Sequence, residues 1–249
     1  IFNGDIFSRK EVEKTSKAIS DRLAESGYTF ANVNAIPDID KENWTVSFVF
    51  AIDPAKRVYV RRINISGNTT TRDEVIRREL RQIEGGWLST KDVRRSKVRL
   101  QRLSFFDDVN IETPAVAGTE DQVDVDVRVK ERQTGTMSFG LGYSESDGVL
   151  LQAAINQKNL FGSGKELDIS IDTSKISKAA RIRYFNPYYT VNGVSRGFYL
   201  TWTDIDAAEA DLSRYINATL SLGVNYRIPL SELNSFNFSF GPDRSKLST

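Results

Sequence analysis

The stretch that decides the fold lies near the C-terminal end of the chain: Ile216-Asn217-Ala218-Thr219-Leu220-Ser221-Leu222-Gly223-Val224-Asn225-Tyr226-Arg227-Ile228. Its even-numbered positions are all apolar, and its odd-numbered positions are polar or glycine. Successive side chains of a β-strand point to opposite faces, so the pattern predicts a long strand with one apolar and one polar face. Such a strand suits a wall between lipid and water.

Strands of the same kind fill the chain from Thr134 onward, where no helical pattern is found. We expect them at residues 134–143, 149–158, 165–173, 178–186, 197–205, 213–228 and 233–240. Strands of about 10 residues match a tilted membrane crossing. Aromatic residues near strand ends are typical of an interfacial girdle: Tyr184, Phe185, Tyr188 and Tyr189. The pattern therefore favours an antiparallel transmembrane β-barrel over a soluble β-sandwich, whose strands also alternate.

The number of expected strands indicates an incomplete barrel. Bacterial single-chain barrels have an even number of strands, from about 8 upward, so we expect this chain to end before the barrel does. Residues 241–246, which begin Gly241-Pro242-Asp243, are not predicted to form a strand. Residue 1 lies inside an αβ pattern without a signal peptide, so we interpret the chain as a piece whose natural N-terminus lies upstream.

Composition excludes several classes of function. The 249 residues carry a net charge of +1 and contain neither cysteine nor histidine. Catalysis by Ser-His-Asp or Cys-His groups and zinc sites with Cys or His ligands are therefore impossible. We expect no enzyme activity, no metal, no cofactor and no nucleic-acid partner. No apolar run approaches the roughly 18 to 20 residues of a membrane helix, so a crossing would use strands.

Residues 58–131 show a different, α+β pattern: strand, helix, helix, strand, strand. Thr71 with Glu74, and Ser89 with Asp92, have the spacing of capping boxes that open the two helices. We expect the first helix to bury Val75, Ile76 and Leu80, and the second to bury Val93, Leu100 and Leu103. The last strand alternates four valines with charged residues: Val123, Val125, Val127 and Val129.

Residues 1–53 look like the end of another copy of this unit. Ser8 and Glu11 predict a capped helix, and Gly27 is a plausible left-handed stop. Phe30 precedes Phe106 by 76 residues, and related strand positions later in the two copies are 77 residues apart. This period predicts a tandem array of α+β domains.

Charge is segregated within the second copy. The segment 72–102 contains ten Lys or Arg residues against five acids, whereas the segment 103–127 contains seven acids and no basic residue. A solvated pair of helices beside a solvated strand would explain this pattern. A docking surface for partner proteins would also explain it, because complementary charge steers association.

Four motifs resemble the BamA family of outer-membrane-protein assembly factors. They are the segments 77–87, 129–135, 159–164 and 186–195, which include Arg77-Arg78-Glu79-Leu80, Gly85-Gly86-Trp87, Asn159-Leu160-Phe161-Gly162 and Asn186-Pro187-Tyr188-Tyr189. The resemblance covers residues 1–240 in order. It implies that residues 1–53 are part of the fourth polypeptide-transport-associated (POTRA) domain and that residues 58–131 are the fifth. Residues 134–249 would then begin a sixteen-stranded barrel in the bacterial outer membrane, with the POTRA domains in the periplasm.

The resemblance also implies sites and partners. The segment with Arg77, Arg81 and Glu84 corresponds to the docking site for lipoproteins of the BAM complex, notably BamD. The strand 134–143 corresponds to the first strand of a lateral gate, where Thr136, Ser138, Gly140 and Gly142 lie on one face and unfolded outer-membrane clients would pair. Packing or curvature would also explain the glycines. Outer-membrane lipids complete the implied partners.

Three alternatives to an assembly factor have to be considered. A two-partner-secretion transporter would share this architecture but export a soluble polypeptide through the barrel. A passive porin is disfavoured because porins lack the α+β array, and a carboxylate enzyme because no compact group of acids is present.

Overall fold

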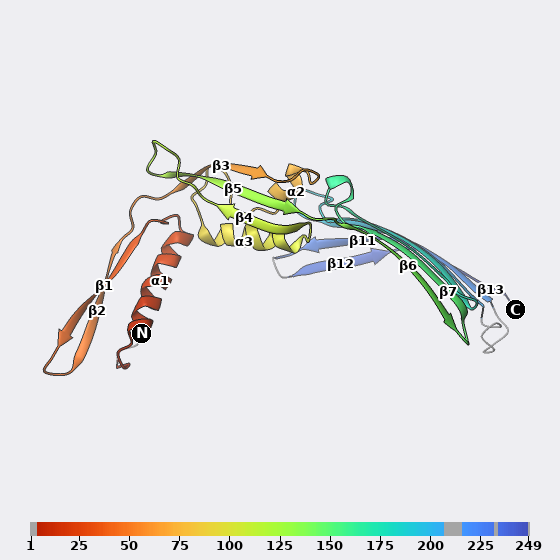
Figure 1. The fold of residues 1–249 in the computed structure, drawn as a ribbon, viewed down its shortest axis with the longest axis horizontal. Helices are drawn as coiled ribbons and strands as arrows, with labels where there is room; N and C mark the ends of the chain where they lie inside the picture. Colours follow the sequence, from red (N-terminus) through yellow and green to blue (C-terminus); the bar gives the residue numbers. More distant parts are fainter. Residues whose placement is uncertain (1–3, 207–215, 232–233, 249) are drawn as a thin grey trace. The chain divides into compact units, whose positions relative to one another are not determined.

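The computed structural model describes residues 4–206, 216–231 and 234–248. The chain divides into two compact units, which we describe separately (Figure 1). The repeat unit comprises Ile1–Thr69 and Ile76–Arg132, and the sheet unit comprises Thr70–Val75 and Gln133–Thr249.

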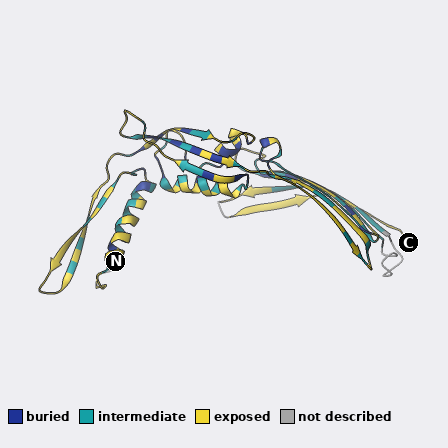
Figure 2. Ribbon diagram, in the orientation of Figure 1, coloured by how far each residue is buried: buried dark blue, intermediate teal, exposed yellow. Residues whose placement is uncertain are grey.

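The second half of the repeat unit contains a three-stranded sheet with the order β3-β5-β4. The strands are β3 (Tyr59–Ser66), β4 (Phe106–Glu112) and β5 (Gln122–Glu131), with β3 parallel and β4 antiparallel to β5. The four valines of β5 face the core with at most 6% exposure. Helix α3 (Thr90–Arg102) packs on this sheet and buries Leu100 completely. The alternation in β5 thus confirms the half-buried strand, and Figure 2 shows the buried positions.

The two predicted helix caps have different outcomes. Ser89 is the N-cap of α3, and its hydroxyl accepts a hydrogen bond from the Asp92 backbone N–H at 3.2 Å. The helix predicted after Thr71 is much shorter than expected, because α2 spans only Asp73–Arg77. The Thr71 hydroxyl accepts a hydrogen bond from the Asn159 side-chain amide at 2.8 Å, a tertiary contact that the cap spacing did not predict.

The first half of the repeat unit is an incomplete copy of the same fold. It contains α1 (Arg9–Glu25) and an antiparallel pair formed by β1 (Asn32–Asp40) and β2 (Thr45–Asp53). Ser8 is the N-cap of α1, but its side chain makes no capping hydrogen bond, so the predicted capping box is not formed. Gly27 adopts the predicted left-handed conformation after the helix, with φ +95°.

The two copies are joined by a short linker that packs tightly. The Val58 N–H donates to the Gly27 carbonyl at 2.8 Å. The Arg57 guanidinium lies 4.9 Å from the ring centroid of Tyr28 and 5.3 Å from that of Trp87. These contacts connect residues of the first copy, the linker and the second copy.

The sheet unit is one antiparallel sheet with the order β12-β11-β10-β9-β8-β7-β6, and β13 also pairs with β11. Its strands are β6 (Gly135–Ser144), β7 (Gly148–Gln157), β8 (Glu166–Thr173), β9 (Ser177–Asn186), β10 (Ser195–Asp206), β11 (Ile216–Pro229), β12 (Ser235–Phe240) and β13 (Asp243–Ser248). These bounds confirm the expected strands to within a few residues. The expected start of the sixth strand, residues 213–215, and the first residue of the seventh, residue 233, lie outside the described residues.

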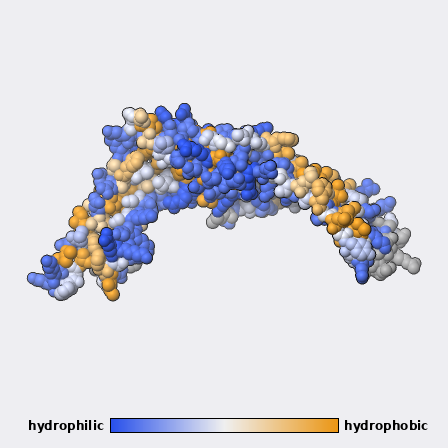
Figure 3. Space-filling view, viewed as in Figure 1, coloured by the Kyte–Doolittle hydropathy of each residue, from blue (hydrophilic) through white to orange (hydrophobic). Residues whose placement is uncertain are grey.

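Strand register gathers the apolar positions on one face of this sheet. Leu200 lies opposite Leu222 on β11 and Ile182 on β9, so the three side chains share a face. The opposite face carries ion pairs across β8 and β9, including one of 2.6 Å between Arg183 and Asp168. Hydrophobic surface follows the strands in Figure 3. The alternation therefore yields an apolar face and a polar face, as a barrel wall requires.

The expectation that residues 241–246 do not form a strand is wrong. Strand β13 pairs with residues 216–221 of β11, beyond the segment of β11 that pairs with β12. Gly241 and Pro242 separate β12 from β13 and interrupt the pairing with β11. The Leu222 N–H of β11 donates to the Pro242 carbonyl at 3.3 Å. Sheet context overrides weak local β-propensity, because the edge of β11 offers partners to any backbone that follows it.

No helix among the described residues has both the length and the apolar character needed to span a membrane.

The first prediction concerns Gly67, which has φ +86° and whose added Cβ would lie 1.9 Å from the Val129 carbonyl oxygen. Gly118 is a matched control, with φ +81° and no atom within 4 Å of an added Cβ. We expect Gly118→Ala to lower the free energy of unfolding by about 1 kcal/mol, from left-handed strain alone. Gly67→Ala should lower the free energy of unfolding by at least about 2 kcal/mol more than Gly118→Ala, because its Cβ collides with the Val129 carbonyl oxygen. Urea unfolding of residues 1–132 measures both, and equal losses would contradict the packing described for Gly67.

Candidate functional site

Strand β6 is the last strand of the sheet and has one hydrogen-bonded neighbour, β7, among the described residues. Its apolar side chains are more exposed than those of the inner strands. Phe139 and Leu141 are 77% and 79% exposed, whereas Leu200 on β10 is 41% exposed. The second edge of β6 is therefore available to another strand in this part of the structure.

The gate residues predicted from sequence lie together on the polar face of β6. Thr136, Ser138, Gly140 and Gly142 alternate with apolar residues on the other face, and Ser138 lies opposite Ala154 on β7. The register thus places the predicted residues on one strand face and at a free sheet edge.

Gly140 and Gly142 of β6 are not required by their neighbour β7. A Cβ added to Gly140 would lie 3.5 Å from Gln152, and one added to Gly142 would lie 3.5 Å from Leu150, which are ordinary contacts. Gly223 differs, because a Cβ there would meet the Tyr199 ring at 2.5 Å. Packing against β7 therefore does not explain why β6 carries glycine at positions 140 and 142.

A hollow of about 440 Å³ lies over this part of β6. Its lining includes Gly140, Gly142, Leu150, Gln152, Asp172 and Ser174. The hollow extends from the two glycines inward over β7 to the end of β8.

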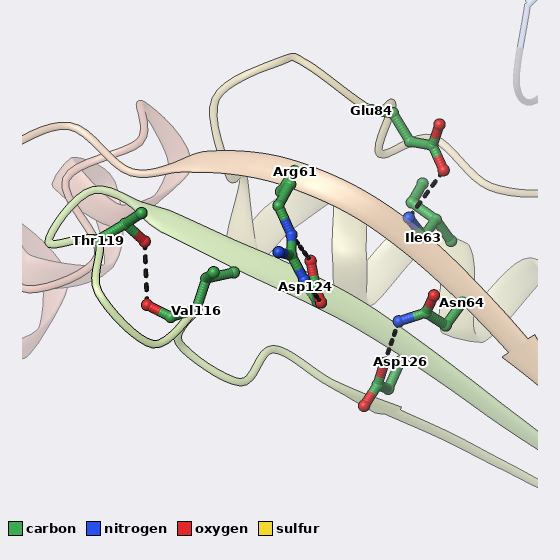
Figure 4. Close-up of polar contacts among 8 residues, drawn as sticks. All are labelled: Arg61, Ile63, Asn64, Glu84, Val116, Thr119, Asp124 and Asp126. Atoms are coloured by element: carbon green, nitrogen blue, oxygen red, sulfur yellow. Dashed lines mark hydrogen bonds and ion pairs between the residues drawn. The ribbon is translucent and has the colours of Figure 1, made fainter.

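The second candidate site lies in the repeat unit around Glu84. Glu84 follows α2 in a loop, and its carboxylate accepts a hydrogen bond from the Ile63 backbone N–H at 2.8 Å (Figure 4). The same carboxylate lies 3.4 Å from the Arg77 guanidinium. The Arg81 backbone N–H donates to the Ser96 hydroxyl at 2.8 Å. The structure thus brings Arg77 and Glu84 into contact and ties the backbone of Arg81 to α3.

Glu84 completes a row of hydrogen bonds along the outer edge of β3. The Val60 N–H donates to the Gly86 carbonyl at 2.9 Å, and the Val60 carbonyl accepts from the Gly85 N–H at 2.8 Å. Ile63 comes next on this edge, after a bulge in β3. Its N–H bonds to Glu84. A carboxylate therefore continues the edge pairing where the loop backbone ends, and no sequence pattern predicts this role.

Part of the segregated charge is paired within the repeat unit. Arg61 donates to both carboxylate oxygens of Asp124, at 2.8 and 2.6 Å (Figure 4). This hydrogen bonding lowers the pKa of Asp124 below its ordinary value. Arg99 lies 2.6 Å from the buried carboxylate of Glu79. These residues contribute to the fold, and the half-exposed Arg77 and Glu84 are left more accessible.

The described residues contain no group of three or more side chains able to hold a metal ion.

Comparison with known families identifies both parts of the chain. Residues 1–55 and 58–132 match the POTRA model, described as a surface antigen variable number repeat. The chain belongs to the POTRA family. Residues 159–249 match the Omp85 superfamily domain, so the POTRA repeats are joined to the strands of an Omp85 barrel.

Curated relatives of this POTRA chain carry the name outer membrane protein assembly factor BamA. The protein from Neisseria meningitidis is 33% identical over 99% of this chain and 31% of its own length. The protein from Buchnera aphidicola is 32% identical over 95% of this chain and 38% of its own length. The chain thus spans about a third of the length of these relatives.

Solved structures support the same fold. BamA from Haemophilus ducreyi lacking POTRA domains 1–3 matches with a TM-score of 0.83 and 34% identity, over 100% of this chain and 47% of that one. CdiB from Acinetobacter baumannii matches with a TM-score of 0.59 but only 13% identity, which shows a shared fold alone. The fold is therefore POTRA repeats followed by an open antiparallel sheet of barrel strands, and the barrel is incomplete in this chain.

The second prediction tests the edge role of Glu84 through hydrogen exchange at Ile63. Glu84→Gln keeps an oxygen that can accept from the Ile63 N–H, whereas Glu84→Ala removes it. We expect exchange of this N–H to accelerate about fivefold in Glu84→Ala, since a hydrogen bond contributes about 1 kcal/mol. The rate should change little in Glu84→Gln. NMR measures both rates, and unchanged exchange in Glu84→Ala would show that the carboxylate does not protect this edge.

Proposed function

We propose that this chain is part of a non-enzymatic factor that inserts β-barrel proteins into the bacterial outer membrane. Its POTRA repeats lie in the periplasm and dock partners, and its first barrel strand templates client strands. The observation that carries the proposal is the pair Gly140 and Gly142 in β6, at positions where packing against β7 does not require glycine. The curated relatives are named as outer membrane protein assembly factors, which supports the same function.

The physical problem of insertion concerns backbone polar groups. A client strand that enters lipid carries unpaired N–H and C=O groups, each of which costs several kcal/mol if left unsatisfied. A free strand edge offers partners for these groups through β-augmentation. Glycines at that edge allow another backbone to approach closely, and they weaken the strand's own pairing. In this proposal β6 separates from the last strand of the barrel and pairs with the client.

Docking uses the exposed charges of the second POTRA repeat. Arg77 and Glu84 form an ion pair with each side chain about half exposed, and the backbone of Arg81 is held by Ser96. We place the docking of a BamD-type lipoprotein here, with Glu84 recognising a basic residue of the partner. Because Glu84 also bonds to Ile63, Glu84→Gln, which keeps an acceptor oxygen, separates the role of the charge from that of the bond.

The third prediction concerns the seam between β6 and the last barrel strand. The chain contains no cysteine, so introduced pairs have no background. In the full-length protein, a cysteine at Ser138 and one opposite it on the last strand should form a disulfide, provided the Cα atoms lie within about 7 Å. This lock should abolish insertion of client barrels into vesicles, and reduction should restore it.

A matched control uses a disulfide between β6 and β7, the strand with which β6 already pairs. Cysteines at Ser138 and Ala154 are register partners on β6 and β7, so their disulfide constrains β6 without closing its other edge. Insertion by this control should be close to normal. If the seam-locked protein inserted clients at the control rate, templating by β6 would be wrong.

The fourth prediction separates charge recognition from edge protection at Glu84. Glu84→Gln should retain the Ile63 bond but weaken co-purification of the lipoprotein, and Glu84→Lys should weaken it further. A reciprocal acid on the lipoprotein should restore binding to Glu84→Lys. If Glu84→Gln and wild type recovered equal amounts of lipoprotein, the negative charge would not be a docking determinant.

A further inference from the structure

An arginine lies on the apolar face of the sheet. Arg196 is the second residue of β10 and lies opposite Tyr226 on β11 and Asn186 on β9. Positions 196, 198 and 200 of β10 share a face, and Phe198 and Leu200 are apolar. An arginine at this place differs from the apolar residues that follow it along the strand.

Aromatic rings surround the Arg196 guanidinium. Its central carbon lies 3.6 Å from the ring centroid of Tyr189 and 5.0 Å from that of Phe198. Tyr189 packs edge-on against Tyr226 at 6.4 Å, and Tyr226 stacks on Phe238 at 5.2 Å. We call Arg196, Tyr189, Phe198 and Tyr226 the arginine cage.

The turn before β10 positions the cage. The Tyr189 N–H donates to the Val194 carbonyl at 2.9 Å, and the Val194 N–H donates to the Thr190 hydroxyl at 3.2 Å. These bonds hold the Tyr189 backbone beside the start of β10. The ring is therefore set over Arg196 by the fold of the turn.

Arg196 differs from Arg181 and Arg183 on the polar face in having no carboxylate partner among the described residues. Arg181 and Arg183 pair with Asp172 and Asp168 at 3.2 and 2.6 Å. No ion pair of the described residues includes Arg196. Ring faces attract the guanidinium, but its N–H groups lie in its plane and prefer the oxygens of an anion.

The cage lies at a defined level of the barrel wall. Antiparallel strands alternate in direction, so the turn 187–194 is at the same end as Gly135, where the chain enters the sheet. In an outer membrane with POTRA domains in the periplasm, this end meets the periplasmic leaflet. Aromatic residues are enriched at such interfaces, and the anion found there is the phosphate of a phospholipid.

We propose that the arginine cage binds the phosphate of a phospholipid headgroup in the periplasmic leaflet. The inference rests on the proposed residence in the outer membrane, but not on strand templating by β6. The guanidinium edge donates hydrogen bonds to the phosphate oxygens, and the exposed ring edges of Tyr189 and Phe198 contact the glycerol and upper acyl chain. The lipid thereby neutralises an arginine that the sheet leaves without an acid.

The test uses the full-length protein in detergent, titrated with phosphatidylglycerol and observed by native mass spectrometry. Arg196→Gln should weaken retention of the lipid at least about tenfold, since the hydrogen bonds from a charged donor to the phosphate are lost. Tyr189→Leu should weaken it less, because the charge remains. Arg183→Gln is the matched control, an arginine of the neighbouring strand on the opposite face, and should bind as wild type.

Two further measurements test whether the cage recognises the phosphate of the lipid. A phosphate-free glycolipid with the same acyl chains should bind equally to wild type and Arg196→Gln, and inorganic phosphate should not displace phosphatidylglycerol. Equal phosphatidylglycerol binding by wild type and Arg196→Gln, or equal loss in Arg183→Gln, would overturn the proposal. Client insertion measured on the same variants is a separate readout. A variant that loses lipid but inserts clients leaves the proposed function intact, and failure of the seam lock leaves the lipid site intact.

Discussion

Satisfaction of backbone hydrogen bonds at strand edges is the constraint on which this structure depends. An unpaired strand edge is a template for another chain, and the two units treat their edges differently. In the repeat unit, the Gly85-Gly86 loop and the Glu84 carboxylate cover the outer edge of β3. In the sheet unit, β6 has no second neighbour among the described residues. The edge of β3 is covered within its own domain, whereas the sheet unit is an incomplete barrel, and β6 is the strand to which we assign pairing with clients.

The sequence predicted those elements whose patterns are long and regular. The four valines of β5 and the seven apolar positions of β11 alternate with polar residues. Only a strand places all the apolar side chains on one face and the polar ones on the other, so these strands and their faces were predictable. Charged or glycine residues at the alternate positions do not disturb that pattern. The tandem α+β array followed from the same regularity together with the repeat period, and its assignment as POTRA domains followed from the resemblance.

Elements whose conformation depends on distant partners were not predictable. Thr71 has the spacing of a helix cap, but Asn159, which is 88 residues away, bonds to its hydroxyl. Residues 243–248 have little strand character, and β11 nevertheless pairs with them. For the docking site, resemblance pointed to Arg77, Arg81 and Glu84, while the bond from Ile63 to Glu84 could be found only in three dimensions. Arg196 was likewise invisible, because its ring contacts come from a turn and two strands.

The contact between Tyr199 and Gly223 has an evolutionary consequence. These residues lie directly opposite each other on β10 and β11, and the tyrosine ring occupies the space that any side chain at position 223 would need. A larger residue at 223 would be tolerated only if the tyrosine were lost or reoriented. The two positions should therefore change together across homologous barrels, as a covarying pair that reports their contact.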